Sequence, residues 1–136
     1  REQVLENMID TIIHRGTGQF RQFVDEDAAL GFRRLSIIDL SESGDQPLYN
    51  EDRSKVLVFN GEIYNYQELR EELIQAGHTF VSNTDSETLI HGYEQWGEEL
   101  VYRLRGMYAF AIWDQKAKDC FQRGIFLVLS RFIMRR

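Results

Sequence analysis

The stretch Val56-Leu57-Val58-Phe59-Asn60-Gly61-Glu62-Ile63-Tyr64-Asn65 joins an apolar run to a polar segment that can begin a helix. The apolar run at positions 56–59, rich in β-branched and aromatic residues, predicts a strand. Asn60-Gly61 then has two interpretations. An Asn-Gly pair between apolar runs favours a tight hairpin turn. The carboxamide of Asn60 and the N–H of Gly61 can also point at one developing negative oxygen, which describes an oxyanion hole.

Four further motifs accompany this stretch in a fixed order along the chain. They are Arg33-Arg34-Leu35-Ser36-Ile37-Ile38-Asp39-Leu40, Gln46-Pro47-Leu48, Ser82-Asn83-Thr84-Asp85-Ser86-Glu87 and Gly106-Met107-Tyr108-Ala109-Phe110-Ala111. With all five motifs in order, residues 1–121 resemble the glutaminase domain of glutamine-hydrolysing asparagine synthetase, a class II glutamine amidotransferase. The resemblance implies glutamine as the small-molecule substrate and ammonia, used in asparagine biosynthesis, as the product.

The resemblance also implies which residues bind glutamine. Arg34 matches the residue that pairs with the α-carboxylate, a task that suits a planar guanidinium. Glu62 and Asp85 match the acidic groups that hold the α-ammonium. Leu35 and Ile37 match positions that offer backbone contacts.

Three of these residues have ordinary structural interpretations as well. Arg34 beside another arginine can be a surface cation. Asp85 before Ser-Glu-Thr can act as a helix N-cap, and Glu62 can be a solvated strand residue. The ordered motifs favour the binding roles over these alternatives.

The nucleophile of the family is not found in this chain. In the family an N-terminal cysteine attacks the glutamine amide, its α-amine helps to move the proton, and a thioester forms. This chain begins at Arg1, and its only cysteine is Cys120, whose α-amine lies in a peptide bond. A lone cysteine among apolar neighbours is typically a small buried hydrophobe. Asn60 and Gly61 would remain as an oxyanion hole without its nucleophile. A second departure is His14-Arg15-Gly16-Thr17-Gly18, where the family continues after Gly with Pro-Asp.

The last fifteen residues, 122–136, form a basic and apolar tail that departs from the family. Permitted codons for the run from Arg123 to Met134, read from the third base, encode RDIFGIKPFY, which is the continuation that the family has. We interpret the tail as the product of a frameshift near Gln122; an ordinary divergent tail is the alternative. The sequence therefore predicts a partial domain, truncated at both ends, over residues 1–121.

Composition limits the class of protein. A chain of 136 residues with 43% hydrophobic residues and one proline fits a single globular domain. The tail carries four arginines and no acid, so residues 1–121 hold 12 basic against 22 acidic groups and predict no nucleic-acid partner. One cysteine permits no internal disulfide and suits the cytoplasm. No apolar run predicts a membrane span, and no signal peptide pattern is present at the first residues.

Other site chemistries have little support in the sequence. His14, His78 and His91 show no metal-ligand spacing with one another or with Cys120, so no metal site is predicted. No glycine-rich phosphate motif appears. We expect no cofactor in this chain, since the ATP and Mg²⁺ of the family belong to a synthetase domain that these residues do not include.

Periodicity and turn residues predict an α+β fold with antiparallel sheets. Expected helices are residues 2–14, a helix that begins after Asn65 and ends near Gly77, residues 86–96 and a short helix around Leu100. Expected strands are residues 19–24, 28–32, 35–38 and 56–59, and a hairpin of 107–113 with 120 onward. The resemblance implies the N-terminal-nucleophile hydrolase sandwich, two antiparallel sheets flanked by helices. Without its first strand, that sandwich would expose a sheet edge, which predicts marginal stability or self-association.

Two functions from different classes therefore remain open. One is a glutaminase domain, inactive alone, of an asparagine synthetase or a related amidotransferase. The other is a non-catalytic remnant that binds an amino acid or a partner. Ammonia release from glutamine would discriminate between them, and without an N-terminal thiol we expect none.

Overall fold

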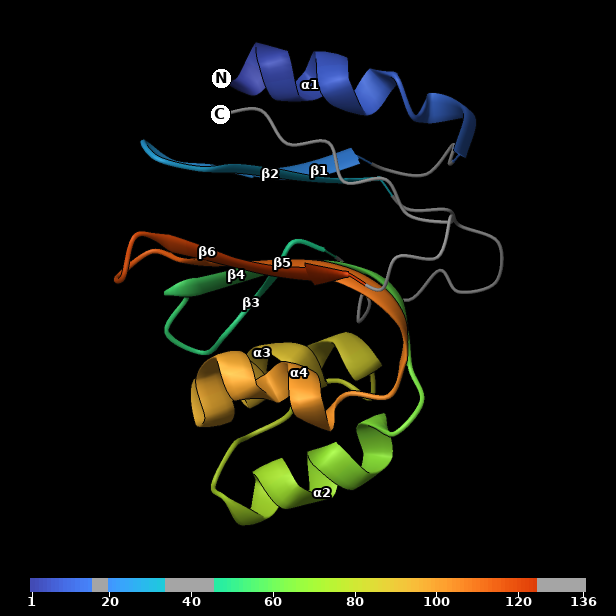
Figure 1. Ribbon diagram of the computed structural model, residues 1–136. Coiled ribbons are helices and arrows are strands. Elements are labelled where there is room, and N and C mark those ends of the chain that lie inside the picture. Colours follow the sequence, from blue (N-terminus) through green and yellow to red (C-terminus); the bar gives the residue numbers. More distant parts are fainter. Residues whose placement is uncertain (16–19, 34–45, 125–136) are drawn as a thin grey trace.

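Two antiparallel sheets and their helices form successive layers in the computed structural model, which describes residues 1–15, 20–33 and 46–124. Helix α1 (Glu2–Asp10) covers the hairpin of β1 (Phe20–Val24) and β2 (Ala29–Arg33) (Figure 1). A four-stranded sheet lies on the other side of this hairpin (Figure 1). Helices α3 (Asp85–Trp96) and α4 (Leu100–Arg103) lie over its far face, and α2 (Tyr66–Gln75) packs against α3 (Figure 1). The expected α+β fold with antiparallel sheets is confirmed.

The four-stranded sheet has the strand order β3-β4-β5-β6, and every neighbouring pair is antiparallel. Its strands and the helices that cover it are β3 (Leu48–Tyr49), β4 (Lys55–Ile63), α2 (Tyr66–Gln75), α3 (Asp85–Trp96), η3 (Gly97–Glu99), α4 (Leu100–Arg103), β5 (Gly106–Asp114) and β6 (Asp119–Gly124). The predicted hairpin of residues 107–113 with 120 onward is confirmed as β5–β6. The predicted helices after Asn65 and at 86–96 are confirmed as α2 and α3.

Some expected boundaries differ from the structure. The helix expected at residues 2–14 ends at Asp10, and the 3₁₀ helix η1 (Ile13–Arg15) follows a turn. The strand expected at residues 35–38 lies outside the described residues. Strand β4 runs four residues past Phe59, so the interpretation of Asn60-Gly61 as a hairpin turn is wrong. Tertiary pairing with β5 overrides the local turn preference there.

Strands β4 and β5 pair along nine residues, from Lys55 opposite Asp114 to Ile63 opposite Gly106. Near the end of the pair the two backbones approach unusually closely. A Cβ atom on Gly61, whose φ is +139°, would lie 2.1 Å from the Met107 carbonyl oxygen. A Cβ on Gly106, with φ +159°, would lie 2.1 Å from the Glu62 oxygen. Glycine is therefore required on both strands of this pair.

Both faces of the four-stranded sheet are covered. One face packs against the helices through a core cluster composed of Leu57, Phe59, Ile63, Leu69, Leu89, Ile90, Leu100, Leu104, Phe110, Ile112 and Phe121. Along β5, successive residues from Ala109 to Trp113 are all buried. Because neighbouring residues on a strand point to opposite faces, this continuous burial requires a cover on each side. The β1–β2 hairpin lies over the second face (Figure 1).

The β1–β2 turn is tied to the larger sheet by one carboxylate. Asp25 accepts hydrogen bonds from the backbone N–H groups of Asp27 and Ala28, at 2.7 and 2.6 Å, and so closes the turn. Its second oxygen accepts the indole N–H of Trp113 at 2.7 Å. Burial opposes ionisation of Asp25, yet these hydrogen bonds and Lys118 hold its pKa below the usual 3.8. Within the described residues, β1 and β2 pair only with each other.

No helix within residues 1–15, 20–33 and 46–124 has both the length and the apolar character needed to cross a membrane.

Replacement of Gly61 tests the close approach of β4 and β5. We expect Gly61→Ala to lower the free energy of unfolding by about 3 kcal/mol or more, because the strain of a positive φ adds to the clash with the Met107 carbonyl. The matched control is Gly77→Ala, with φ +102° and no atom within 4 Å of the added Cβ. Its free energy of unfolding should fall by about 1 kcal/mol, the cost of backbone strain alone. Urea unfolding of both variants measures the difference, and equal losses would contradict the close approach.

Candidate functional site

The outer edge of β4 is completed by side chains rather than by a full strand. Strand β3 pairs with β4 only at Leu57 and Val56. Farther along, the Phe59 N–H donates to Gln46 Oε1 at 2.5 Å, and the Ile63 N–H donates to Asp85 Oδ2 at 2.9 Å. Among residues 1–15, 20–33 and 46–124, β4 pairs only with β3 and β5, so these two side chains satisfy donors that no described strand reaches.

Four of the seven predicted site residues lie together at this edge. Asn60, Gly61 and Glu62 are consecutive and exposed on β4. Asp85, the first residue of α3, reaches across to the amide of Ile63, the residue after Glu62. Asp85 and Ile63 are 22 residues apart, so their spacing along the chain does not predict this contact. The contact forms because α3 packs on the sheet.

Asp85 does not act as the helix N-cap, so that alternative interpretation is wrong. The N-cap position belongs to Thr84, whose backbone is extended. Partial burial of the Asp85 carboxyl raises its pKa above 3.8, and the nearby charge of Glu62 adds to this effect. Hydrogen bonds from backbone N–H groups oppose the rise. Two neighbouring acids, Glu62 and the poorly solvated Asp85, therefore lie near the end of β4.

The segment that leads to Asp85 is held by Glu87. This carboxylate is 3% exposed and accepts the backbone N–H groups of Val81 and Ser82, each at 2.7 Å. The Ser82 hydroxyl also donates to Glu87 at 2.5 Å. A fully buried carboxylate requires such donors. Glu87 thus fixes the start of α3, on which the position of Asp85 depends.

Glu87 is not among the site residues predicted from the sequence. A usable signal was nevertheless present, because Glu87 shares a helix face with Ile90 and His91, three and four residues later. All three side chains are buried. An acid on a buried face indicates a carboxylate with specific donors.

The remaining predicted residues, Arg34, Leu35 and Ile37, lie outside the described part of the chain. A hollow of about 320 Å³ lies between α2 and the 82–84 segment. Its lining consists of Tyr66, Gln67, Arg70, Glu71, Ile74 and Asn83. Of the predicted site residues that the structure describes, Asn60, Gly61, Glu62 and Asp85, none lines it.

Cys120 lies on β6 opposite Trp113, and the expectation that it is buried is wrong because the residue is exposed. Neighbouring atoms still desolvate its thiol in part and, with the charge of Asp119, raise its pKa above 9. A raised pKa leaves less of the reactive thiolate at neutral pH. The described surroundings of Cys120, burial and the charge of Asp119, thus disfavour its role as a nucleophile.

A comparison with known protein families shows which family the chain belongs to. The family described as a glutamine amidotransferase domain matches residues 1–124, which include every described helix and strand. The chain belongs to this family. The resemblance inferred from the five motifs is confirmed.

Curated relatives of this amidotransferase domain are asparagine synthetases. The chain is 49% identical over 115 residues to asparagine synthetase [glutamine-hydrolyzing] 1 of Bacillus subtilis, covering 85% of this chain and 18% of that protein. It is 46% identical over 106 residues to the asparagine synthetase [glutamine-hydrolyzing] of Zea mays, covering 78% and 18%. The chain therefore spans less than a fifth of the length of these relatives.

Solved structures show the same fold. The chain is similar to the glutamine phosphoribosylpyrophosphate amidotransferase of B. subtilis complexed with ADP and GMP, with a TM-score of 0.52 at 24% identity. That match covers 64% of this chain and 21% of the other. A structure titled as the allosteric regulatory enzyme of purine biosynthesis gives a TM-score of 0.54, also at 24% identity. At this identity the likeness concerns the fold alone.

Substitution of Glu87 tests its role as the anchor of the amidotransferase domain's α3 start. In Glu87→Gln one acceptor oxygen becomes an NH₂ group that faces backbone donors, so we expect a loss of about 2 kcal/mol in the free energy of unfolding. Hydrogen exchange at the Val81 and Ser82 amides should accelerate, and exchange at Ile63 should follow as Asp85 loosens. Exposed Glu68→Gln on α2 is the control. Unchanged exchange in Glu87→Gln would contradict the anchoring role.

Proposed function

We propose that this chain binds glutamine at the outer edge of β4 and is the glutaminase part of an asparagine synthetase. The observation that carries the proposal is the contact of Asp85 with Ile63, which sets a second carboxylate beside Glu62 on the strand that bears Asn60 and Gly61. Family membership and the asparagine synthetase relatives support glutamine as the substrate.

The two carboxylates suit the α-ammonium of an amino acid. Glu62 and Asp85 repel each other, and burial already disfavours the charge on Asp85. A cation bound between them would relieve the repulsion and supply donors to both groups. Glu62 is exposed, so the approach to this position is open to a small solute.

Asn60 and Gly61 are proposed to stabilise the oxyanion formed from the glutamine amide. The N–H groups of Phe59 and Ile63 both face the outer edge of β4. Alternation along the strand places the N–H of Gly61, midway between them, toward the same edge. With no side chain on Gly61, a substrate oxygen can approach that N–H closely.

The remaining roles follow from the family resemblance and are part of the proposal. Arg34 would pair with the glutamine α-carboxylate, and Leu35 and Ile37 would offer backbone contacts. We also propose that the layers belong to the N-terminal-nucleophile hydrolase type, which the likeness to solved amidotransferases supports. Because Cys120 lacks a free α-amine and an activating environment, these 136 residues should bind glutamine without hydrolysing it.

Glutamine binding to the chain tests the proposal. Isothermal titration calorimetry should detect binding, and Asp85→Asn should weaken it about tenfold or more through the loss of a charge-assisted contact to the ammonium. Glu2→Gln is the matched control, since Glu2 on α1 lies across both sheets from α3 (Figure 1). An assay for released ammonia should remain at background. Equal affinities for the parent chain, Asp85→Asn and Glu62→Gln would reject the site.

The raised pKa of Asp85 gives a separate prediction for stability. Between pH 3.8 and the higher folded pKa, the folded chain binds more protons than the unfolded chain, so the contribution of Asp85 to stability decreases as pH rises. The parent chain should therefore lose stability relative to Asp85→Asn between pH values below 3.8 and neutral pH. Urea unfolding at both pH values measures this. A difference that stays constant or changes in the opposite direction would contradict the effect of burial.

A further inference from the structure

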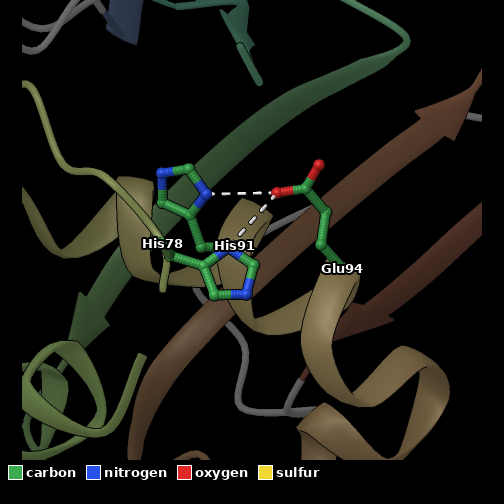
Figure 2. Close-up of side chains that lie close together, drawn as sticks. All are labelled: His78, His91 and Glu94. Atoms are coloured by element: carbon green, nitrogen blue, oxygen red, sulfur yellow. Dashed lines mark hydrogen bonds and ion pairs between the residues drawn. The ribbon is translucent and has the colours of Figure 1, made fainter. Parts of the chain in front are cut away.

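A second polar cluster lies where the segment after α2 contacts α3. Two histidines and one carboxylate converge there: His78 from that segment, and His91 and Glu94 from α3 (Figure 2). One ligand atom from each side chain lies within 4.8 Å of the others. The Glu94 Oε2 atom is 3.1 Å from His91 Nδ1 and 3.8 Å from His78 Nδ1 (Figure 2).

We propose that His78 Nδ1, His91 Nδ1 and Glu94 Oε2 form a binding site for a divalent transition-metal ion, with Zn²⁺ as the best-fitting ion. Two imidazoles and one carboxylate are a ligand set that Zn²⁺ accepts. In a tetrahedral site with bonds of about 2.0–2.1 Å, ligand atoms are about 3.3 Å apart. The two separations measured from Glu94 Oε2 bracket that value. Mg²⁺ and Ca²⁺ prefer oxygen ligands and fit less well.

The surroundings orient both imidazoles for this role. His78 Nε2 lies 3.0 Å from Gln95 Oε1, and His91 Nε2 lies 3.5 Å from Glu87 Oε1. The Gln95 oxygen can accept a proton from His78 Nε2, and the Glu87 carboxylate is close enough to favour a proton on His91 Nε2. A neutral imidazole protonated at Nε2 presents an unprotonated Nδ1, which is the atom turned toward Glu94.

The carboxylate is held in the same way. Glu94 Oε1 accepts a hydrogen bond from Asn50 Nδ2 at 2.7 Å, which leaves Oε2 directed at the histidines. Metal-bound histidines and carboxylates in proteins characteristically have such outer partners. Here all three proposed ligands have one, although they come from two separate parts of the chain.

A fourth ligand position can be filled from the adjacent turn. Glu51 Oε1 lies 3.8 Å from His91 Nδ1, and its side chain is 54% exposed and so able to reorient. On another side, the ring of Phe80 packs edge-on against His91, with 4.7 Å between ring centroids. The cluster is thus shielded at His91, which is 2% exposed, and open toward Glu51.

Metal binding would connect the 78–82 segment to α3. Glu87 already holds Val81 and Ser82 while it faces His91. A bound ion would add a link at His78 and stabilise the folded chain according to its concentration and affinity. The inference is independent of glutamine binding, since none of the residues assigned to glutamine is a ligand.

The contacts also have a simpler interpretation. A protonated His91 between Glu87 and Glu94 would form ion pairs without any metal. That arrangement leaves no Nδ1 lone pair for an ion, so it predicts no stoichiometric Zn²⁺ binding at neutral pH. Metal titration separates the two possibilities.

The test uses the untagged 136-residue chain stripped of metal with a chelator. Titration with Zn²⁺ should give one equivalent bound and a higher Tm, and Co²⁺ should give the visible absorption of a tetrahedral site. His78→Gln and Glu94→Gln should each weaken Zn²⁺ affinity at least tenfold, since loss of even an outer partner costs about 10- to 100-fold. Both residues are partly exposed, and unchanged circular dichroism would show that these variants fold.

His14→Gln is the control, because His14 in η1 lies on the α1 side of the molecule (Figure 1). It should bind Zn²⁺ as the parent chain does. Nitrogen chemical shifts of the imidazoles should report coordination through Nδ1 of His78 and His91. The proposal is overturned by an absence of stoichiometric binding, by affinity that survives both His78→Gln and Glu94→Gln, or by an equal loss in His14→Gln.

Discussion

The pairing of β4 with β5 is the constraint on which the rest of this structure depends. It joins nine residues on each strand, and the backbones approach so closely near its end that Gly61 and Gly106 cannot carry side chains. This ladder presents one face to the helices and the other to the β1–β2 hairpin. Both faces of the strands are covered by apolar layers. Polar side chains therefore contact β4 at its outer edge. Gln46 and Asp85 complete that edge.

Helix α3 connects this edge to the rest of the polar chemistry. Its first residue, Asp85, contacts β4, and Glu87, two residues later, holds the segment before the helix. His91 and Glu94 follow on the same side of the helix. A short run of sequence thus carries the proposed ammonium site, its anchor and two ligands of the proposed metal site. The helical repeat places Glu87, His91 and Glu94 on one face of α3. Asp85, two residues before Glu87, lies on a different face, from which it contacts β4.

The chain belongs to the glutamine amidotransferase family, and its curated relatives are much longer than it is. It matches the family over residues 1–124 and spans less than a fifth of the asparagine synthetases to which it is similar. The described residues contribute the acidic and oxyanion-binding side of the proposed glutamine site. The side that would bind the α-carboxylate depends on Arg34, which is outside them.

The sequence by itself determined the elements with strong local signals: the amphipathic helices, the β5–β6 hairpin, the α+β class and the family. It also predicted Asn60, Gly61, Glu62 and Asp85 as one group, through ordered motifs rather than through geometry. Only the tertiary structure decided that Asn60-Gly61 continues a strand instead of turning, since pairing with β5 outweighs local preference. Only the tertiary structure placed Asp85 against Ile63 and His78 beside His91. These contacts join segments whose spacing along the chain carries no periodic signal, so packing alone creates them.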